Sequence, residues 1–423
     1  MHFLYRLITY LLYPIAPLYL YFRKLKKKED PTRYIEKLSK ISTPRGDGFL
    51  IWFHVASVGE AMSILPLIDN CIQERKINRI LITSITLSSG NILHKRFKQN
   101  PKVIHQFLPL DIAILTKKFL DHWRPNLSIF IDSEIWPNLI LQISKKKIPL
   151  LLINARITKK SFDRWKLVIG FAKKIFGKFD LCIAANKQSE NYLKILGAKN
   201  TKNYGNLKFA KSKTANGRQL NSSLLSKIES RKIWCASSTH YNEEILCGKT
   251  HLELKKIYKN MLTIIIPRHV NRVGKIKDQL AKYNLSVCLY KDSDKITEST
   301  DVLLIDAYGE STKFYKIVKC VLLGKSLVES LKSDSGQNPI EASIFGCQVI
   351  HGPYVSNFSE VYEYLQSLNV AKKVNDIEEL KDQLVEQLKT DKVINSEVIK
   401  KIEYYGETTL NNVLNEIKIY ISK

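Results

Sequence analysis

Short apolar runs alternate with longer mixed segments along most of the chain beyond Lys28. Each run is nearly continuous in apolar side chains, and each intervening segment is long enough for a helix. This pattern is typical of parallel strands that are buried on both faces of a sheet. The predicted strands are residues 49–57, 79–86, 103–110, 127–134, 150–156 and 181–186, followed by 233–239, 262–268, 287–290, 301–306, 320–324 and 348–352.

The alternation of apolar runs and mixed segments stops over the polar tract 210–227 and then resumes, which indicates a linker between two domains. A chain of 423 residues is also too long for one hydrophobic core. We therefore predict an α/β fold with two Rossmann-like, doubly wound domains that face a cleft, residues 29–209 and 228–400. The tail is rich in Glu, Lys and Leu with a helical period, and residues 401–423 are predicted to form the C-terminal helix.

An apolar segment opens the chain, residues 3–22, with Arg6 as its single charge. The basic cluster RKLKKK follows at 23–28, and roughly 20 apolar residues cross a bilayer as a helix. We predict that residues 1–28 are an N-terminal membrane anchor with a basic flank, which leaves the remaining chain in the cytoplasm. Five tyrosines and two prolines in the segment keep a second possibility open, a helix lying in the membrane interface.

The charge balance is strongly basic: Lys+Arg 67 against Asp+Glu 40 gives a net charge of +27. Such a balance favours a polyanionic partner, and an anionic membrane surface or a phosphorylated substrate fits better than nucleic acid, because no nucleic-acid module signature is present. The seven cysteines never have CxxC spacing and the nine histidines show no ligand spacing. Asp292 and Asp294 lie in a hydrophilic stretch interpreted as a surface loop. No metal and no cofactor are predicted.

Several predicted strands end in reactive side chains. In FHVASVGE, Glu60 follows the first strand, where open α/β sheets bind their ligands. A glutamate there is also favoured by the dipole of the following helix, so both a catalytic and a capping role stay open. The same placement recurs at Asp132, Glu134, Asn154 and Arg156, and in the second half at Arg268, His269, Gly309 and Glu310.

The stretch 324–360 is the densest in potential ligand-binding residues. Ser335 to Asn338 indicate a tight loop, and Pro339 suits the first turn of a helix. The start of a helix favours a phosphate, and Glu341 is placed to accept hydrogen bonds from ribose hydroxyls. Asn338 and Glu341 also have the spacing of a capping box, so a capped helix without a ligand is the alternative.

Nine ordered motifs resemble those of the Kdo transferases, membrane-associated glycosyltransferases that add 3-deoxy-manno-octulosonic acid (Kdo) to lipid A precursors. The resemblance covers nearly the whole chain. The motifs are HVASVGE (54–60), SEIWPN (133–138), INAR (153–156), GNLKF (205–209), IPRH (266–269), YGE (308–310), SLVE (326–329), QNPIEAS (337–343) and HGPYVSNFSE (351–360).

The resemblance implies a GT-B fold whose last helix crosses back to the first domain, and an inverting transfer of Kdo from CMP-Kdo to a lipid A precursor (lipid IV-A) without a metal. It implies an inner-membrane location with the catalytic domains on the cytoplasmic face. The implied base is Glu60, and Glu134 and Lys208 are the other implied catalytic residues. The implied CMP-binding residues are Arg268, His269, Tyr308, Gly309, Glu310, Ser326, Asn338, Pro339, Ile340 and Glu341.

The chain departs from the family pattern near the nucleotide residues. Lys325 replaces the second glycine before SLV, Gln337 replaces a histidine, and Asp132 stands where glutamate is frequent. A GT-B enzyme that uses a UDP- or GDP-sugar with a lipid acceptor is the alternative function, and a non-enzymatic, membrane-tethered binder of polyanions is a further one. For the basic and aromatic segment 157–179, contact with an anionic lipid surface and ordinary packing on the sheet both stay open.

Overall fold

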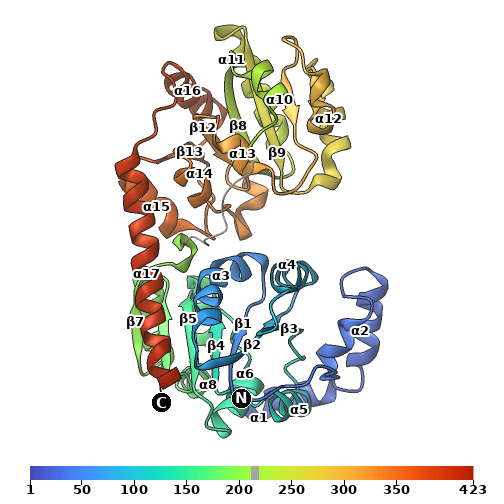
Figure 1. Cartoon of the computed structure of the whole chain (residues 1–423), viewed down its shortest axis with the longest axis vertical. Coiled ribbons are helices and arrows are strands. Elements are labelled where there is room, and N and C mark those ends of the chain that lie inside the picture. The colour runs from blue at the N-terminus through green and yellow to red at the C-terminus, as the bar shows by residue number, and fades with distance from the viewer. Residues whose placement is uncertain (211–218, 423) are drawn as a thin grey trace. The chain divides into compact units, whose positions relative to one another are not determined.

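The computed structural model describes residues 1–210 and 219–422, which form two compact α/β units (Figure 1). Residues 1–210 and 405–422 make up the first unit, and residues 219–404 make up the second. Each unit is built on a seven-stranded sheet. Of the predicted linker, residues 211–218 lie outside the described residues, whereas Ser222–Ile228 form the helix α10.

The sheet of the first unit is entirely parallel, in the order β3-β2-β1-β4-β5-β6-β7. The chain therefore reverses its direction of winding between β1 and β4, and such a switch point is where doubly wound sheets bind ligands. The strands are β1 (Phe49–His54), β2 (Ile77–Ser84), β3 (Val103–Phe107), β4 (Leu127–Ile131), β5 (Leu150–Ala155), β6 (Leu181–Ala184) and β7 (Thr201–Asn203).

Both faces of this sheet are covered. Along β1, Leu50 and Trp52 join one buried cluster while Ile51 and Phe53 join the other, because successive side chains point to opposite faces. Besides the two N-terminal helices described below, the α-helices of the first unit are α3 (Val58–Gln73), α4 (Leu87–Phe97), α5 (Ala113–Trp123), α6 (Pro137–Lys145), α7 (Lys159–Lys166), α8 (Ile169–Phe176), α9 (Lys187–Leu196) and the part of α17 (Ser396–Ser422) from residue 405 onward.

The second unit has a parallel sheet in the order β10-β11-β9-β8-β12-β13-β14, with its switch point between β8 and β12. Its strands are β8 (Lys232–Thr239), β9 (Met261–Pro267), β10 (Val287–Leu289), β11 (Val302–Leu304), β12 (Cys320–Leu323), β13 (Gln348–His351) and β14 (Ala371–Lys373). Its α-helices are α10, α11 (Glu243–Ile257), α12 (Val273–Ala281), α13 (Ser311–Tyr315), α14 (Ile340–Ile344), α15 (Ser359–Ser367), α16 (Ile377–Leu388) and the part of α17 before residue 405.

All twelve predicted strands are confirmed, although most end one to three residues earlier than predicted. The strands β7 and β14 were not predicted from the sequence. Both are three-residue edge strands, and neither has the continuous apolar run that marks a buried strand.

The N-terminal segment does not form the single helix that was predicted, and its role as a membrane anchor stays a prediction. Residues 3–22 fall in two helices, α1 (His2–Leu11) and α2 (Ala16–Leu25), because Pro14 lies in the break and cannot continue a helix. In the part of the chain that the structure describes, no single helix is long and apolar enough to cross a membrane. Among the described helices, one bent pair, Phe3–Leu11 and Ala16–Leu25 with 61° between them, has the length and composition of a broken membrane span.

Candidate active site

Glu60 lies in the first turn of α3, directly after the central strand β1. The side chain of Ser57 caps this helix by accepting a hydrogen bond from the Glu60 N–H at 3.3 Å. In return, the Glu60 carboxylate accepts from the Ala56 N–H and the Ser57 hydroxyl, both at 2.7 Å. This is a variant of the capping box, and it fixes the carboxylate at the carboxyl end of β1.

Glu134 follows β4, on the other side of the switch point. One of its oxygens is 2.9 Å from Trp136 Nε1 and 3.2 Å from Nε2 of the buried His54. A carboxylate can only accept, so His54 donates through Nε2, and its Nδ1 then accepts from the Thr83 hydroxyl at 2.9 Å. Thr83 in turn accepts from Trp52 Nε1 at 2.8 Å. The buried network orients Glu134 from inside the sheet.

The pKa of Glu60 is raised to about 7. Burial is the main cause, the negative charge of Glu134 is the next, and Asp132 adds a smaller repulsion, while the hydrogen bonds from Ala56 and Ser57 oppose the rise. A carboxylate in this environment is a much stronger proton acceptor than an exposed one, and its pKa lies near physiological pH. Such a shift at a switch point is typical of a general base.

Two strained residues shape the same edge of the sheet. Asp132 directly follows β4, and Asn154 is the next-to-last residue of β5. The backbone of both residues is in the left-handed region, with φ of 59° and 54°. The Asn154 side chain accepts from the Leu207 N–H at 2.9 Å and thereby fixes the short 3-10 helix Leu207–Phe209, which carries Lys208. The structure therefore brings Glu60, Glu134 and the Lys208 backbone to the carboxyl ends of the adjacent strands β1, β4 and β5.

In the second unit, Arg268 and His269 follow β9 and are exposed. The Arg268 backbone N–H donates to Thr239 at the end of β8, at 3.0 Å, and the His269 ring lies 5.6 Å from the ring of His240. The pKa of His240 is lowered to about 4, mainly by burial and further by the charges of Lys325 and other nearby cations. Lys325 and Arg268 therefore both lie near His240, at the carboxyl end of the second sheet, and their positive charges favour binding of an anion there.

Glu243 was not singled out from the sequence, yet it organises the switch point of the second unit. Its buried carboxylate accepts from the backbone N–H groups of His240 at 2.9 Å and of residues 325, 326 and 327 at 2.7, 3.0 and 3.3 Å. It joins the loop after β8 to the loop after β12. The only sequence signal is a glutamate in a first turn, which capping explains equally well.

Ser326 lies inside this loop and is fully buried. Its hydroxyl donates to the Leu323 carbonyl at 2.5 Å and accepts from the Gly352 N–H at 3.0 Å. Through these two hydrogen bonds Ser326 holds the loop in shape. Contact between Ser326 and CMP stays a prediction.

The other predicted nucleotide residues lie on two turns. The Asn338 side chain accepts from the Ile340 N–H at 3.0 Å, and Asn338 and Glu341 are exposed on either side of the buried Pro339 and Ile340. The hydroxyl of the exposed Tyr308 accepts from the Val270 N–H at 3.3 Å, so the turn with Tyr308, Gly309 and Glu310 lies beside the loop that follows Arg268. Glu310 itself pairs with Lys313 at 2.5 Å and accepts from Tyr290 at 3.1 Å.

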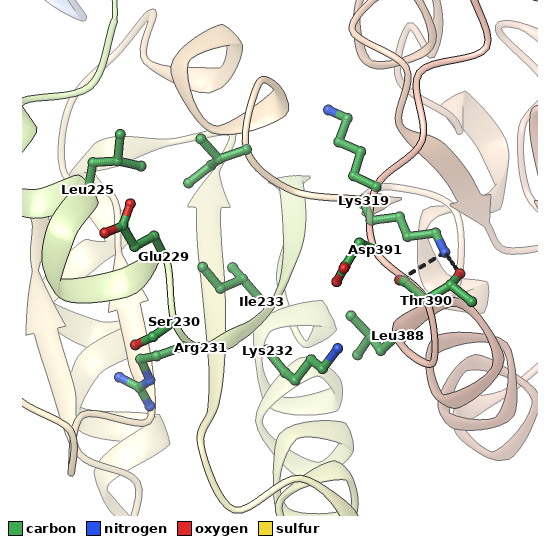
Figure 2. A pocket seen from close by; sticks show the side chains of 12 residues that line it. Leu225, Glu229, Ser230, Arg231, Lys232, Ile233, Lys319, Leu388, Thr390 and Asp391 are labelled. Carbon is green, nitrogen blue, oxygen red and sulfur yellow. Dashed lines mark hydrogen bonds between the residues drawn. The ribbon is translucent and has the colours of Figure 1, made fainter.

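A pocket of about 380 Å³ opens elsewhere in the second unit (Figure 2). It is lined by Lys232, the first residue of β8, and by Lys319, which immediately precedes β12 and donates to Thr390. It therefore lies at the amino ends of the strands, whereas parallel sheets bind ligands at the carboxyl ends. None of the predicted site residues lines it.

Comparison with known proteins agrees with the motifs. The family model described as 3-deoxy-D-manno-octulosonic-acid transferase (kdotransferase) matches residues 27–211. The 3-deoxy-D-manno-octulosonic acid transferase of Rickettsia bellii is 32% identical over 98% of this chain and 96% of its own length. The chain belongs to the Kdo transferase family. A Haemophilus influenzae member is 30% identical over 91% of this chain and 90% of its own. By this membership the protein is a glycosyltransferase.

Solved structures with low sequence identity share the fold. A putative UDP-N-acetylglucosamine 2-epimerase from Listeria monocytogenes gives a TM-score of 0.60 at 12% identity and covers 89% of this chain and 97% of its own. The UDP-GlcNAc 2-epimerase of Neisseria meningitidis gives 0.55 at 14% identity, with 88% and 99% covered. These likenesses agree with an α/β fold of two parallel sheets for the Kdo transferase described here, and the solved neighbours are GT-B-like. That the two domains face a common cleft stays a prediction.

Proposed function

We propose that this Kdo transferase moves Kdo from CMP-Kdo to a lipid A precursor, with Glu60 as the general base. The observation that carries the proposal is the pKa of about 7 of Glu60 at the switch point, beside Glu134. Neither burial nor the neighbouring acids would be needed if Glu60 only capped α3. An exposed glutamate with its usual pKa caps a helix equally well.

In the proposed step, Glu60 takes the proton of an acceptor hydroxyl while that oxygen forms a bond to the anomeric carbon of Kdo. The bond between this carbon and the phosphate oxygen of CMP breaks, and CMP leaves with the electron pair. Attack opposite the leaving group inverts the anomeric configuration. Arg268 suits the departing phosphate, since a guanidinium can donate to two oxygens at once, and Lys208 supplies a further positive charge.

The acceptor is proposed to approach from a membrane surface. The helices α1 and α2 expose a row of large apolar side chains: Phe3, Leu4, Leu7, Ile8, Leu11, Leu12, Ile15, Leu18 and Phe22. Beside α1 lies a pocket of about 660 Å³, whose lining includes five cations and no acidic side chain: Arg6, Lys117, Lys145, Lys174 and Lys178. An apolar face with adjoining cations suits a helix pair lying in the interface of the cytoplasmic membrane with anionic head groups nearby.

The test is transfer of Kdo by the purified protein from CMP-Kdo, generated in the assay, to a tetraacylated lipid A precursor, with the product identified by mass. We expect addition of Kdo, and we expect CMP to compete with the donor while UDP and GDP do not. Competition by UDP or GDP in place of CMP would point to the alternative donor class. Binding of CMP without any transfer would leave the donor proposal standing and refute the acceptor.

A further inference from the structure

An apolar pocket of about 400 Å³ lies between the N-terminal helix pair and the catalytic edge of the first sheet. Its size falls in the range of small-molecule sites. One wall comes from the helix pair and the other from the segments that follow β3 and β4. The lining is Tyr5, Thr9, Leu12, Ile15, Ala16, Tyr19, Leu110, Asp111, Ile112 and Trp136.

The one carboxylate in this lining does not call for a polar ligand. Asp111 is 8% exposed, and its oxygens accept from the Tyr5 hydroxyl at 2.8 Å and from the backbone N–H groups of Asn138 and Leu139 at 3.0 and 2.8 Å. A buried carboxylate with three donors has little demand for another. The pocket is therefore suited to a hydrocarbon ligand.

Trp136 connects this pocket to the proposed chemistry. Its ring lines the pocket, and its Nε1 donates to Glu134 at 2.9 Å. Glu134 is in turn close enough to Glu60 to raise its pKa. Trp136 and Glu134 thus form a continuous connection from the pocket to the proposed base Glu60.

On this basis, and resting on the proposed function, we infer that the pocket holds one acyl chain of the lipid acceptor. The exposed apolar face of the helix pair is continuous with the pocket through Leu12 and Ile15, which are 52% and 55% exposed and also line it. A chain could thus pass from the membrane interface into the pocket without crossing a polar surface. The acceptor would be positioned by its lipid as well as by its sugar.

Two matched variants test this inference. Ile15→Glu puts a charge in the pocket wall, and Leu18→Glu makes the same change on the same helix pair at a residue that is equally exposed, 56%, but does not line the pocket. Each methylene removed from water is worth about fourfold in affinity. We expect Ile15→Glu to raise KM for a tetraacylated precursor about tenfold or more, and Leu18→Glu about twofold or less, at equal amounts of vesicle-bound protein.

The de-acylated disaccharide bisphosphate is the control acceptor, on which wild type and both variants should have the same rate. Equal effects of the two variants on the acylated acceptor would overturn the pocket and leave the proposed function intact. If wild type transfers no Kdo at all, the proposed function fails, and the pocket is then judged by cross-linking. An acylated precursor with a diazirine in its acyl chain should label peptides carrying residues 110–112 or Trp136, and labelling confined to the exposed helix face would refute the inference.

Discussion

The two units place carboxylates at the same topological position and use them in opposite ways. At the switch point of the first unit, Glu60 lies beside Glu134 and Asp132, and this environment raises its pKa to about 7. At the switch point of the second, Glu243 accepts four backbone N–H groups. Its neighbour Glu244, also buried, pairs with both terminal nitrogens of Arg272, at 2.9 and 3.1 Å.

The difference shows that burial of an acid at a strand end does not by itself indicate catalysis. Burial raises the pKa of Glu243 as well, but its carboxylate accepts four backbone N–H groups from two separate loops and so holds those loops in place. The Glu60 carboxylate accepts two hydrogen bonds, both from the turn that precedes it. An acid repelled by other acids has a heightened affinity for a proton, which is the property a base needs. After β9 in the second unit the exposed Arg268 is a cation instead, and a cation suits the phosphate of a nucleotide donor.

The largest effect is expected for Glu60→Gln, with Glu74→Gln at the other end of α3 as the matched control. Loss of a general base should lower kcat for Kdo transfer about a thousandfold without changing CMP affinity. Activity within a few-fold of wild type would reduce Glu60 to a helix cap. The control should behave as wild type.

The same variant has an expected signature in stability. Because the folded pKa of Glu60, about 7, is above its usual 4.5, the folded state binds the extra proton between these values and ionisation destabilises it as pH rises. At pH 8, Glu60→Gln should therefore be more stable than wild type by up to about 3 kcal/mol, with the difference vanishing below roughly pH 4.5. Chemical denaturation at the two pH values measures it.

Two arginine variants separate ligand binding from structural support within the second unit. Within the described part of the chain, the Arg268 guanidinium makes no ion pair, whereas Arg272 neutralises the buried Glu244. Arg268→Ala should weaken CMP binding about 10- to 100-fold and leave the unfolding free energy unchanged. Arg272→Ala should lower that free energy by about 3 kcal/mol and change CMP affinity little. Calorimetric titration measures the CMP affinity and chemical denaturation measures the unfolding free energy. If Arg272 were the phosphate ligand, Arg272→Ala would weaken CMP binding and Arg268→Ala would not.

Glu134→Gln tests the repulsion directly. Glutamine can still accept from Trp136, but without its negative charge the ionisation of Glu60 becomes easier and the pKa of Glu60 falls. The acidic limb of kcat/KM, near pH 7 in wild type, should move to lower pH by roughly one unit. Asp132→Asn should move it less, since Asp132 contributes less to the shift. An unmoved limb in both variants would assign the titration to another group.

Much of this architecture is predictable from the sequence for a simple reason. A strand buried on both faces must be apolar throughout, so most of the twelve predicted strands stand out, and the residue after such a strand is a natural site candidate. Glu60, Glu134 and Arg268 could be found in this way. The short edge strands β7 and β14 carry no such pattern.

The remainder depends on contacts between residues far apart in sequence. The bonds of Glu243 to residues 325–327 arise only when β8 and β12 become neighbours, and the chain from His54 through Glu134 to Trp136 needs β1 beside β4. Pro14 is a sequence signal for the break between α1 and α2, because proline interrupts a helix. The apolar composition of residues 3–22 taken alone favoured one long helix. The pairing of α1 with Asp111 through Tyr5 could not be inferred from either segment.

The smallest expected effect concerns Lys325, which follows Gly324 in the loop after β12. Its backbone has φ of 58°, in the left-handed region where a side chain costs about 1 kcal/mol or more. Lys325→Gly should therefore raise the unfolding free energy by up to about 1 kcal/mol, whereas Lys325→Ala, which keeps the strain, should not. Both variants remove a charge that lies near His240 and His269, so both should weaken CMP binding by a few-fold. Equal CMP affinity in wild type and both variants would exclude Lys325 from the cations that attract the donor.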